Sequence, residues 1–443
     1  MTRESRNSRP DIAVIFDNFG PYHQARLKGS AAVCKVHGIQ LSGSSKDYAW
    51  VTEDGDGCGI STIVPEGPCT MVSKNEFKKR LEATLGRLRP AAIAIPGWSS
   101  LGAFVALEWA KKNKVPVILM SESTAWDETR IAWKEWVKKN IVSMASTALV
   151  GGHPHADYMK QLGMPSDRIS LGYDAVDNAY FATESERWRG QFPEVACRKY
   201  FLSSNRFIEK KNLFRLLEAY ARYCAGRQGT GSRGQESEHK LLISDHPASE
   251  LWPLVMLGDG ELREKLLAHC EALGLVVIES APWEQRGNFE LGILNDECDQ
   301  PSVYFPGFRQ IDELPRFYAH AGAFVHASTT EQWGLVVNEA MASGLPVIVS
   351  NRVGCAMDLV QEGENGFTFD PYDVEQLTSL LGRISAFDFP LSNLGGASRS
   401  IISSWGPERF GEGLKVAAEK ALEVGPRKPT WIQKLLLETL KRK

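Results

Sequence analysis

The sequence has no apolar run of the roughly 18 residues that a membrane-spanning helix needs. Its eight cysteines are scattered without a C-x-x-C pair, so we expect neither a disulfide framework nor a structural zinc site. A net charge of -3 provides no basic field for nucleic acid. The polar N-terminus lacks the pattern of a signal peptide. We therefore expect a cytoplasmic protein that binds small molecules.

A chain of 443 residues exceeds the roughly 250–300 residues at which one hydrophobic core stops growing, so two domains are expected. In the first half, strand-length apolar runs alternate with helical patterns, which predicts parallel βαβ units. The predicted strands are Asp11–Phe16, Ala91–Pro96, Val115–Met120, Ala148–Gly151 and Arg168–Leu171.

The same pattern restarts near residue 200 and predicts a second α/β domain. Its predicted strands are Tyr200–Ser204, Leu254–Leu257, Leu275–Ile278, Phe324–Ala327 and Pro346–Ser350. Residues 225–250 and 281–300 are rich in small and polar side chains, and we interpret both as surface insertions.

The most informative segment begins at Thr330 and reads TEQWGLVVNEAMASGLPVIVS. A strand leads into a polar turn, and Gly334 then starts a predicted amphipathic helix. Backbone N–H groups and the helix dipole at such a start favour a phosphate. Glu331 and Glu339 flank this position with seven residues between them. One carboxylate can reach a sugar and the other a ribose, although two glutamates at this spacing are often only solvated helix charges.

A second group of residues follows the first strand of the second half, where Arg206, Lys210 and Lys211 precede a helix. Cations at that place can neutralise a diphosphate. The alternative, above all for Lys210, is that these side chains are ordinary exposed charges. The turn LGDG places Gly258 at another junction of strand and helix, which by itself is weak evidence.

Together these motifs resemble the family 4 glycosyltransferases. The resemblance rests on R-x4-K, LGDG, PGF with the following ELPRFYAHA, and E-x7-E, in that order over residues 200–380. It implies the GT-B fold, in which two Rossmann-like α/β/α domains face a central cleft. By resemblance, residues 1–180 would bind the acceptor and 181–405 the nucleotide-sugar donor. Residues 406–443 would return to the first domain as helices.

The resemblance also implies roles for individual residues. Arg206 and Lys211 would bind the donor diphosphate, Glu331 would contact the donor sugar, and Glu339 would hold the ribose. Further donor contacts are implied for Gly258, for Phe308 or Arg309 near the base, and for the backbone of Trp333, Gly334 and Leu335. Trp333 stands where the family often has Phe.

The first half is similar to the family only in outline. Gly20 occupies the position of the glycine-rich loop, which here has one glycine instead of a pair. His23 is a candidate for binding the acceptor. The alternative is that it is a loop histidine that has no catalytic role. Glu122, Asp127 and Arg130 are further acceptor-side candidates, and loop capping explains them equally well. His153 and His155 rank below His23.

We expect no metal cofactor, because Asp54-Gly55-Asp56 is better explained as a surface turn. In the C-terminal segment, Pro407–Leu422 is a predicted helix. A second one groups Trp431, Ile432, Leu435, Leu436 and Leu440 on one side, surrounded by basic residues. We expect it to pack on the first domain, with peripheral membrane contact as the alternative.

The predicted function is retaining transfer of a sugar from a nucleotide-diphosphate donor to a glycan or lipid-linked acceptor, in polysaccharide or glycoconjugate biosynthesis. The alternatives are a GT-B nucleotide-sugar epimerase and a non-catalytic nucleotide-sugar-binding protein. A dinucleotide oxidoreductase is disfavoured, because no G-x-G-x-x-G follows the first strand. The sequence does not determine the sugar, the base, the acceptor or the oligomeric state.

Overall fold

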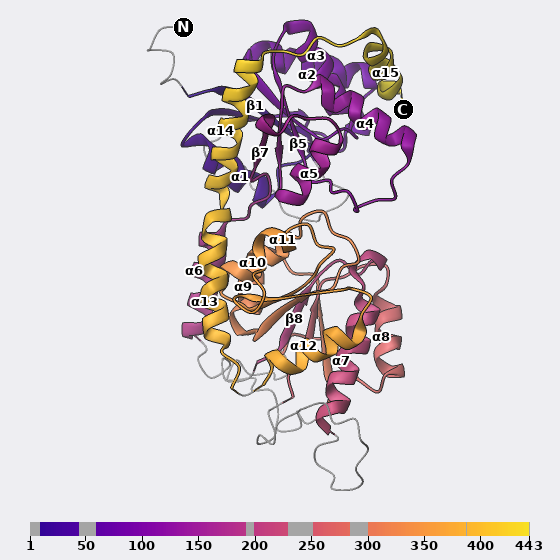
Figure 1. The fold of residues 1–443 in the computed structure, drawn as a ribbon, viewed down its shortest axis with the longest axis vertical. Coiled ribbons are helices and arrows are strands. Elements are labelled where there is room, and N and C mark those ends of the chain that lie inside the picture. Colours follow the sequence, from indigo (N-terminus) through magenta and orange to yellow (C-terminus); the bar gives the residue numbers. More distant parts are fainter. Residues whose placement is uncertain are drawn as a thin grey trace. The chain divides into compact units, whose positions relative to one another are not determined.

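The computed structural model describes residues 9–43, 59–191, 199–228, 251–283, 300–386 and 388–442. The chain forms two compact units, Met1–Asp177 with Ser404–Lys443, and Asn178–Ser403. Within these described residues, each unit contains a seven-stranded sheet in which neighbouring strands are parallel. Helices flank the sheet in each unit (Figure 1). The expected pair of parallel α/β domains is thus confirmed. The units meet along the chain at Asp177 and Ser403, where the sequence suggested 180 and 405.

The first unit has the strand order β3-β2-β1-β4-β5-β6-β7. Its strands are β1 (Asp11–Phe16), β2 (Lys35–Ser42), β3 (Ile60–Val64), β4 (Ala92–Pro96), β5 (Val117–Ser121), β6 (Thr147–Val150) and β7 (Ile169–Leu171). Its α-helices are α1 (Pro21–Ala31), α2 (Lys74–Leu88), α3 (Leu101–Asn113), α4 (Ala132–Met144), α5 (His153–Gln161), α14 (Pro407–Val424) and α15 (Trp431–Arg442).

Helices cover both faces of this sheet because its strands are apolar on both sides. In β1, Ala13 and Ile15 belong to the core beneath α2, α3 and α4, whereas Ile12 and Val14 belong to the core beneath α14. Helices α1 and α14 lie side by side (Figure 1). The C-terminal helix α14 therefore completes the core of the first unit, as the GT-B expectation requires.

The second unit has the strand order β10-β11-β9-β8-β12-β13-β14. Its strands are β8 (Phe201–Ser204), β9 (Leu254–Leu257), β10 (Val276–Ile278), β11 (Ser302–Gly307), β12 (Ala323–His326), β13 (Val347–Ser350) and β14 (Gly366–Phe369). Its α-helices are α6 (Asn178–Gln191), α7 (Leu213–Gln228), α8 (Arg263–Ala272), α9 (Leu314–His320), α10 (Leu335–Ala342), α11 (Ala356–Leu359), α12 (Val374–Ile384) and α13 (Leu391–Ile402).

The long apolar runs were located correctly, and the shorter strands were missed. The predicted bounds of β1 and β9 agree with the structure, and the other predicted strands differ by one or two residues. No strand was predicted for β2, β3, β11 or β14, in which polar residues or glycine interrupt the apolar pattern. Asp54-Gly55-Asp56 and most of both insertions lie outside the described residues.

Each sheet has a position where the strand order reverses, between β1 and β4 and between β8 and β12. The loops after the two strands at such a position diverge to opposite faces, which leaves a crevice at their carboxyl ends. In the second unit, the loops concerned carry Arg206 to Lys211 after β8 and Glu331 after β12. The topology therefore brings two separately predicted motifs together.

Candidate functional site

The loops after β8 and β12 are joined by hydrogen bonds of the main chain and of one buried amide. Thr329 N donates to Lys210 O at 2.9 Å. The side chain of Asn212 donates to Ala327 O at 3.1 Å and to Pro371 O at 2.7 Å. Asn212 adopts a left-handed conformation with φ 58°, which asparagine tolerates better than most residues. This residue ends the short helical turn Glu209–Lys211 and fixes the direction of Lys211.

Lys211 and Glu331 form a direct ion pair at this junction. Their side chains are only 11% and 13% exposed. Lys210 lies on the other side of the carboxylate, with its Nζ 3.5 Å from Oε1 of Glu331. The buried His326, from the end of β12, places Nε2 3.8 Å from Oε2. Glu331 is therefore the centre of a group of three nitrogen-bearing side chains.

The charge of this group follows from its burial and its pairing. Burial alone would raise the pKa of Glu331, but the neighbouring His326 and the charges of Lys211 and Lys210 outweigh it and hold the pKa below its ordinary value. Burial lowers the pKa of Lys211, and the charge of Glu331 opposes that shift. Burial also lowers the pKa of His326. At neutral pH the group is an anionic Glu331 that pairs with cations and has a neutral imidazole beside it.

The segment after Glu331 is held by backbone hydrogen bonds to residues 352–355. Glu331 N donates to Arg352 O at 3.3 Å, and Cys355 N donates to Trp333 O at 3.0 Å. Trp333 is buried, and its Nε1 donates to Asn338 Oδ1 at 2.9 Å. Gly334 has φ 98°, and a Cβ atom there would lie 2.8 Å from Cγ1 of Val353. A glycine is needed at this turn for both reasons.

Helix α10 starts after Gly334, as predicted, but it is not amphipathic. Residues 337–342 are all buried, because α6 and α13 pack against this helix as well as the sheet. Glu339 is thus a buried carboxylate, and Tyr318 Oη donates to its Oε2 at 2.7 Å. Tyr318 was missed as a site residue, although its helix, ELPRFYAHA, formed part of the recognised pattern.

Gly258 lets two loops approach closely at the ends of β8 and β9. Its φ is 133°, and a Cβ atom would lie 1.8 Å from the carbonyl oxygen of Asn205. No side chain fits this position, so the glycine of LGDG has a structural requirement of its own. The neighbouring Arg206 is exposed, and its charge contributes to the lowered pKa of Lys211. Arg206, Lys210 and Lys211 therefore lie at one edge of the sheet, as their spacing predicted.

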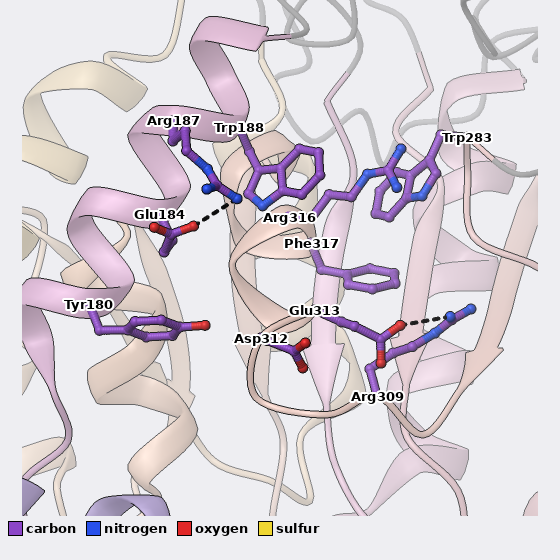
Figure 2. A pocket seen from close by; sticks show the side chains of 10 residues that line it. All are labelled: Tyr180, Glu184, Arg187, Trp188, Trp283, Arg309, Asp312, Glu313, Arg316 and Phe317. Atoms are coloured by element: carbon purple, nitrogen blue, oxygen red, sulfur yellow. Dashed lines mark hydrogen bonds and ion pairs between the residues drawn. The ribbon is translucent and has the colours of Figure 1, made fainter. Parts of the chain in front are cut away.

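Phe308 and Arg309 follow β11 and differ in environment. Phe308 is exposed, whereas Arg309 pairs with Glu313 at 3.1 Å and lies over the ring of Phe317. Arg309 lines a pocket of about 360 Å³ together with residues of α6 and α9. Figure 2 shows the side chains that line it. The lining of this pocket includes none of Lys211, Glu331 or Glu339.

In the first unit, Gly20 and His23 lie at the start of α1. His23 belongs to the first turn of this helix and not to a loop, and its ring packs 4.3 Å from that of Phe16. Burial, assisted by the charge of Arg26, lowers the pKa of His23 to about 3, so the ring is neutral. Arg26 is buried and bound to Asp174 at 3.3 Å and to Ala175 O at 3.1 Å.

The other acceptor-side candidates interact mainly with one another and with their own loop. Arg130 pairs with Asp127 and donates to Ala125 O at 2.9 Å and to Tyr158 Oη at 2.8 Å. Burial, together with the negative charge of Glu122, raises the pKa of Asp174. The contacts of Asp127 and Arg130 are those that the loop-capping alternative describes.

His155 also has a structural role, because its Nδ1 accepts a hydrogen bond from Gly152 N at 3.1 Å at the start of α5. Among the described residues there is no cluster of three or more metal-ligating side chains. None of the described helices is long and apolar enough to span a bilayer.

Comparisons with known proteins agree with this architecture. Residues 296–386 match the family described as Glycosyl transferases group 1. The chain is 34% identical over 143 residues to the sulfoquinovosyl transferase of Arabidopsis thaliana, a match that covers 29% of this chain and 28% of that protein. It is 44% identical over 70 residues to sucrose synthase of Solanum tuberosum, covering 16% of this chain and 9% of that protein. The chain thus matches less than a third of the length of these relatives.

Two solved structures are similar over nearly the whole chain. Sucrose-phosphate synthase from Thermosynechococcus elongatus superposes with a TM-score of 0.65 at 18% identity, covering 92% of this chain and 97% of that one. HepE of Anabaena, solved in complex with UDP, gives a TM-score of 0.62 at 16% identity, with coverage of 91% and 98%. The chain therefore has the GT-B fold, and residues 296–386 in its second unit match the model of the group 1 glycosyl transferases.

Proposed function

We propose that this chain is a retaining glycosyltransferase of family 4 that moves a sugar from a nucleotide-diphosphate donor to a glycan or lipid-linked acceptor, in polysaccharide or glycoconjugate biosynthesis. The observation that carries the proposal is the Lys211–Glu331 pair at the reversal of the second sheet. The pair lies where an open α/β sheet binds its ligand, and Gly334 and the buried Glu339 follow within the same segment.

In this proposal the donor diphosphate is bound by the cations after β8 and by the start of α10. Cleavage of the bond between sugar and phosphate increases the negative charge on the leaving diphosphate. Arg206, Lys211 and the backbone N–H groups after Gly334 would stabilise that charge. Glu331 keeps Lys211 in place while the site is empty, and its own low pKa keeps it anionic.

Glu331 would orient the donor sugar and stabilise the positive charge that develops at the anomeric carbon. Retention is explained by attack from the face that the diphosphate leaves, with the acceptor proton passing to the leaving phosphate. No protein nucleophile is required. Glu339 would accept the ribose hydroxyls, and Tyr318 would keep its carboxylate in a fixed direction. The base would lie near Phe308 or Arg309.

The acceptor belongs to the first unit in this proposal. His23 is neutral over the physiological pH range, so it would act as a hydrogen-bonding group and not as a cation. A cytoplasmic location and the absence of a metal cofactor are also parts of the proposal. The complex of HepE with UDP supports a nucleotide donor for a chain of this fold.

The test is a calorimetric titration of the protein with UDP, GDP and ADP and with their glucose conjugates. We expect one nucleotide sugar to bind, and Arg206→Ala and Glu339→Gln to weaken that binding at least about tenfold, because each removes a charged contact. Lys265→Ala, an exposed cation on α8, is the matched control and should bind as the unaltered protein does.

The donor that binds is then incubated with candidate glycan acceptors, and the anomeric configuration of the product is read by NMR. Retained configuration supports the proposal. Conversion of the donor sugar without an acceptor would instead identify an epimerase. Binding without any turnover would identify a nucleotide-sugar-binding protein, and no binding at all would exclude the donor site.

A further inference from the structure

The pocket of about 360 Å³ in the second unit, which we call the α6/α9 pocket, has a lining that the transfer reaction does not explain. Its volume lies near the lower end of the range of about 300–1,000 Å³ that is typical of small-molecule sites. Aromatic rings, three arginines and three carboxylates line it (Figure 2). Of these lining residues, the proposed donor site uses only Arg309. The α6/α9 pocket therefore needs an explanation of its own.

Arg316 contacts two indole rings of the α6/α9 pocket. Its guanidinium carbon lies 5.0 Å from the centre of the Trp188 ring and 4.3 Å from that of the Trp283 ring. The centre of the Phe317 ring is 4.6 Å from that of Trp283. Attraction between the cation and the two rings holds both indoles in place. Because both indoles are only partly buried, they provide a preformed apolar wall that a ligand can contact.

Most of the charged side chains in the α6/α9 pocket are paired with one another. Arg187 Nη2 lies 3.1 Å from Oε2 of Glu184, and Arg309 Nη1 lies 3.1 Å from Oε1 of Glu313. Each pair has little net charge, but it still contains N–H donors and carboxylate acceptors. A hydroxyl group both donates and accepts hydrogen bonds, so it matches such a pair. The balance of charges favours a neutral ligand that is rich in hydroxyl groups.

Asp312 is the carboxylate of the α6/α9 pocket that is best suited to bind a ligand. It is exposed, and it forms no hydrogen bond or ion pair within the described part of the chain. Tyr180 Oη donates to Ile311 O at 3.3 Å, which attaches α6 to the loop that carries Asp312. The two oxygens of a carboxylate can accept hydrogen bonds from two neighbouring hydroxyl groups. Neighbouring hydroxyl groups are a general feature of sugar rings.

We propose that the α6/α9 pocket binds a neutral sugar unit of a glycan. The C–H face of the sugar ring packs on the indole wall, and its hydroxyl groups bind Asp312 and the Arg187–Glu184 pair. A nucleoside could also stack on an indole, but its base has fewer hydrogen-bond donors for the carboxylates. A diphosphate would need an excess of positive charge, which this lining does not have. The α6/α9 pocket is thus a second carbohydrate site, which goes beyond the proposed transfer reaction.

The test measures binding of the methyl glycosides of glucose, galactose, mannose and N-acetylglucosamine to the full chain by saturation-transfer difference NMR. We expect at least one of them to bind, with the strongest transfer to the C–H protons of one ring face. Asp312→Asn should weaken this binding at least about tenfold, because a charged acceptor is lost. Trp188→Leu should weaken it about two- to tenfold, because the ring contact is lost.

Thermal melts should show that Asp312→Asn unfolds like the unaltered protein, because this carboxylate has no contact to lose. The matched controls are Asp388→Asn, at an exposed carboxylate of the same unit, and Trp431→Leu, at an exposed tryptophan of the first unit. Both should bind the glycoside as the unaltered protein does. Equal loss in the controls and in the pocket variants would overturn the proposal. Failure of all four glycosides to bind would also overturn it, as would binding that Asp312→Asn leaves unchanged.

Competition separates the α6/α9 pocket from the proposed donor site. We expect the glycoside to stay bound when UDP or uridine is added in excess. Displacement by either would make the pocket part of a nucleotide site and would overturn the proposal. Glu339→Gln should leave glycoside binding unchanged while it weakens nucleotide binding. Failure of this inference and failure of the proposed function can therefore be told apart.

Discussion

Replacement of Glu331 by glutamine is the sharpest test of the buried ion pair. The change keeps the shape of the side chain and removes the charge that accompanies Lys211, which is only 11% exposed. Removal of one partner from a buried pair costs about 3–5 kcal/mol. We expect a value near the lower end, about 3 kcal/mol, because water still reaches both side chains.

The pairwise part of this effect can be isolated with a double-mutant cycle. Lys211→Met leaves Glu331 with the more distant Lys210, and the combined variant Glu331→Gln/Lys211→Met leaves neither charge of the pair. We expect the double variant to be more stable than the sum of the single effects predicts, by about 2 kcal/mol. Urea unfolding monitored by circular dichroism gives all four free energies of unfolding.

The exposed pair Arg222–Glu375 provides the matched control, since its side chains are 52% and 75% exposed. Its coupling energy should be below about 1 kcal/mol. A coupling energy at Lys211–Glu331 no larger than that of the exposed pair would refute the reasoning, because burial would then add nothing to the interaction.

The remaining predictions concern pH, a glycine and a tyrosine. The pKa of Glu331 is lower in the folded protein than in the unfolded chain, where it is near 4.5. The ionised carboxylate therefore stabilises the fold above that pH, and this contribution is lost as the pH falls toward the folded pKa. The difference in free energy of unfolding between the unaltered protein and Glu331→Gln should therefore decrease in acid. An unchanged difference at pH 3 would contradict this. Gly258→Ala should lower the free energy of unfolding by at least about 3 kcal/mol, because the new Cβ atom would clash with a backbone oxygen. Gly274→Ala is the control and should cost only about 1–2 kcal/mol, because there is open space around a Cβ atom at that position. If thermal melts show that Gly274→Ala is the more destabilising change, the close contact inferred at Gly258 is wrong. Tyr318→Phe should cost about 1–3 kcal/mol, because Glu339 loses its donor, and it should weaken nucleotide binding in calorimetry; unaltered binding would separate this tyrosine from the site.

The parts predicted correctly from sequence are those in which local pattern and final environment agree. Strands such as β1 and β9 are buried on both faces, so their residues form continuous apolar runs. Strands such as β2 and β14 were missed because glycine or polar residues interrupt that pattern. The pairing of motifs was also foreseeable, since loops after parallel strands end at the same edge of a sheet.

The sequence by itself determined the two α/β domains, the carboxyl-edge position of Arg206, Lys211 and Glu331, and the glycine at the start of α10. Only the tertiary structure decided which of these charges are buried, because burial depends on segments far apart in the chain. Tyr318 reaches Glu339 across 21 positions, and Lys211 reaches Glu331 across 120. The helix α15 packs on the first unit, as expected, but Leu437 and Leu440 make that contact, whereas Trp431, Ile432 and Leu435 are exposed. Its sequence has apolar residues on more than one side, and only contact with α3 and α4 selects the side that is buried.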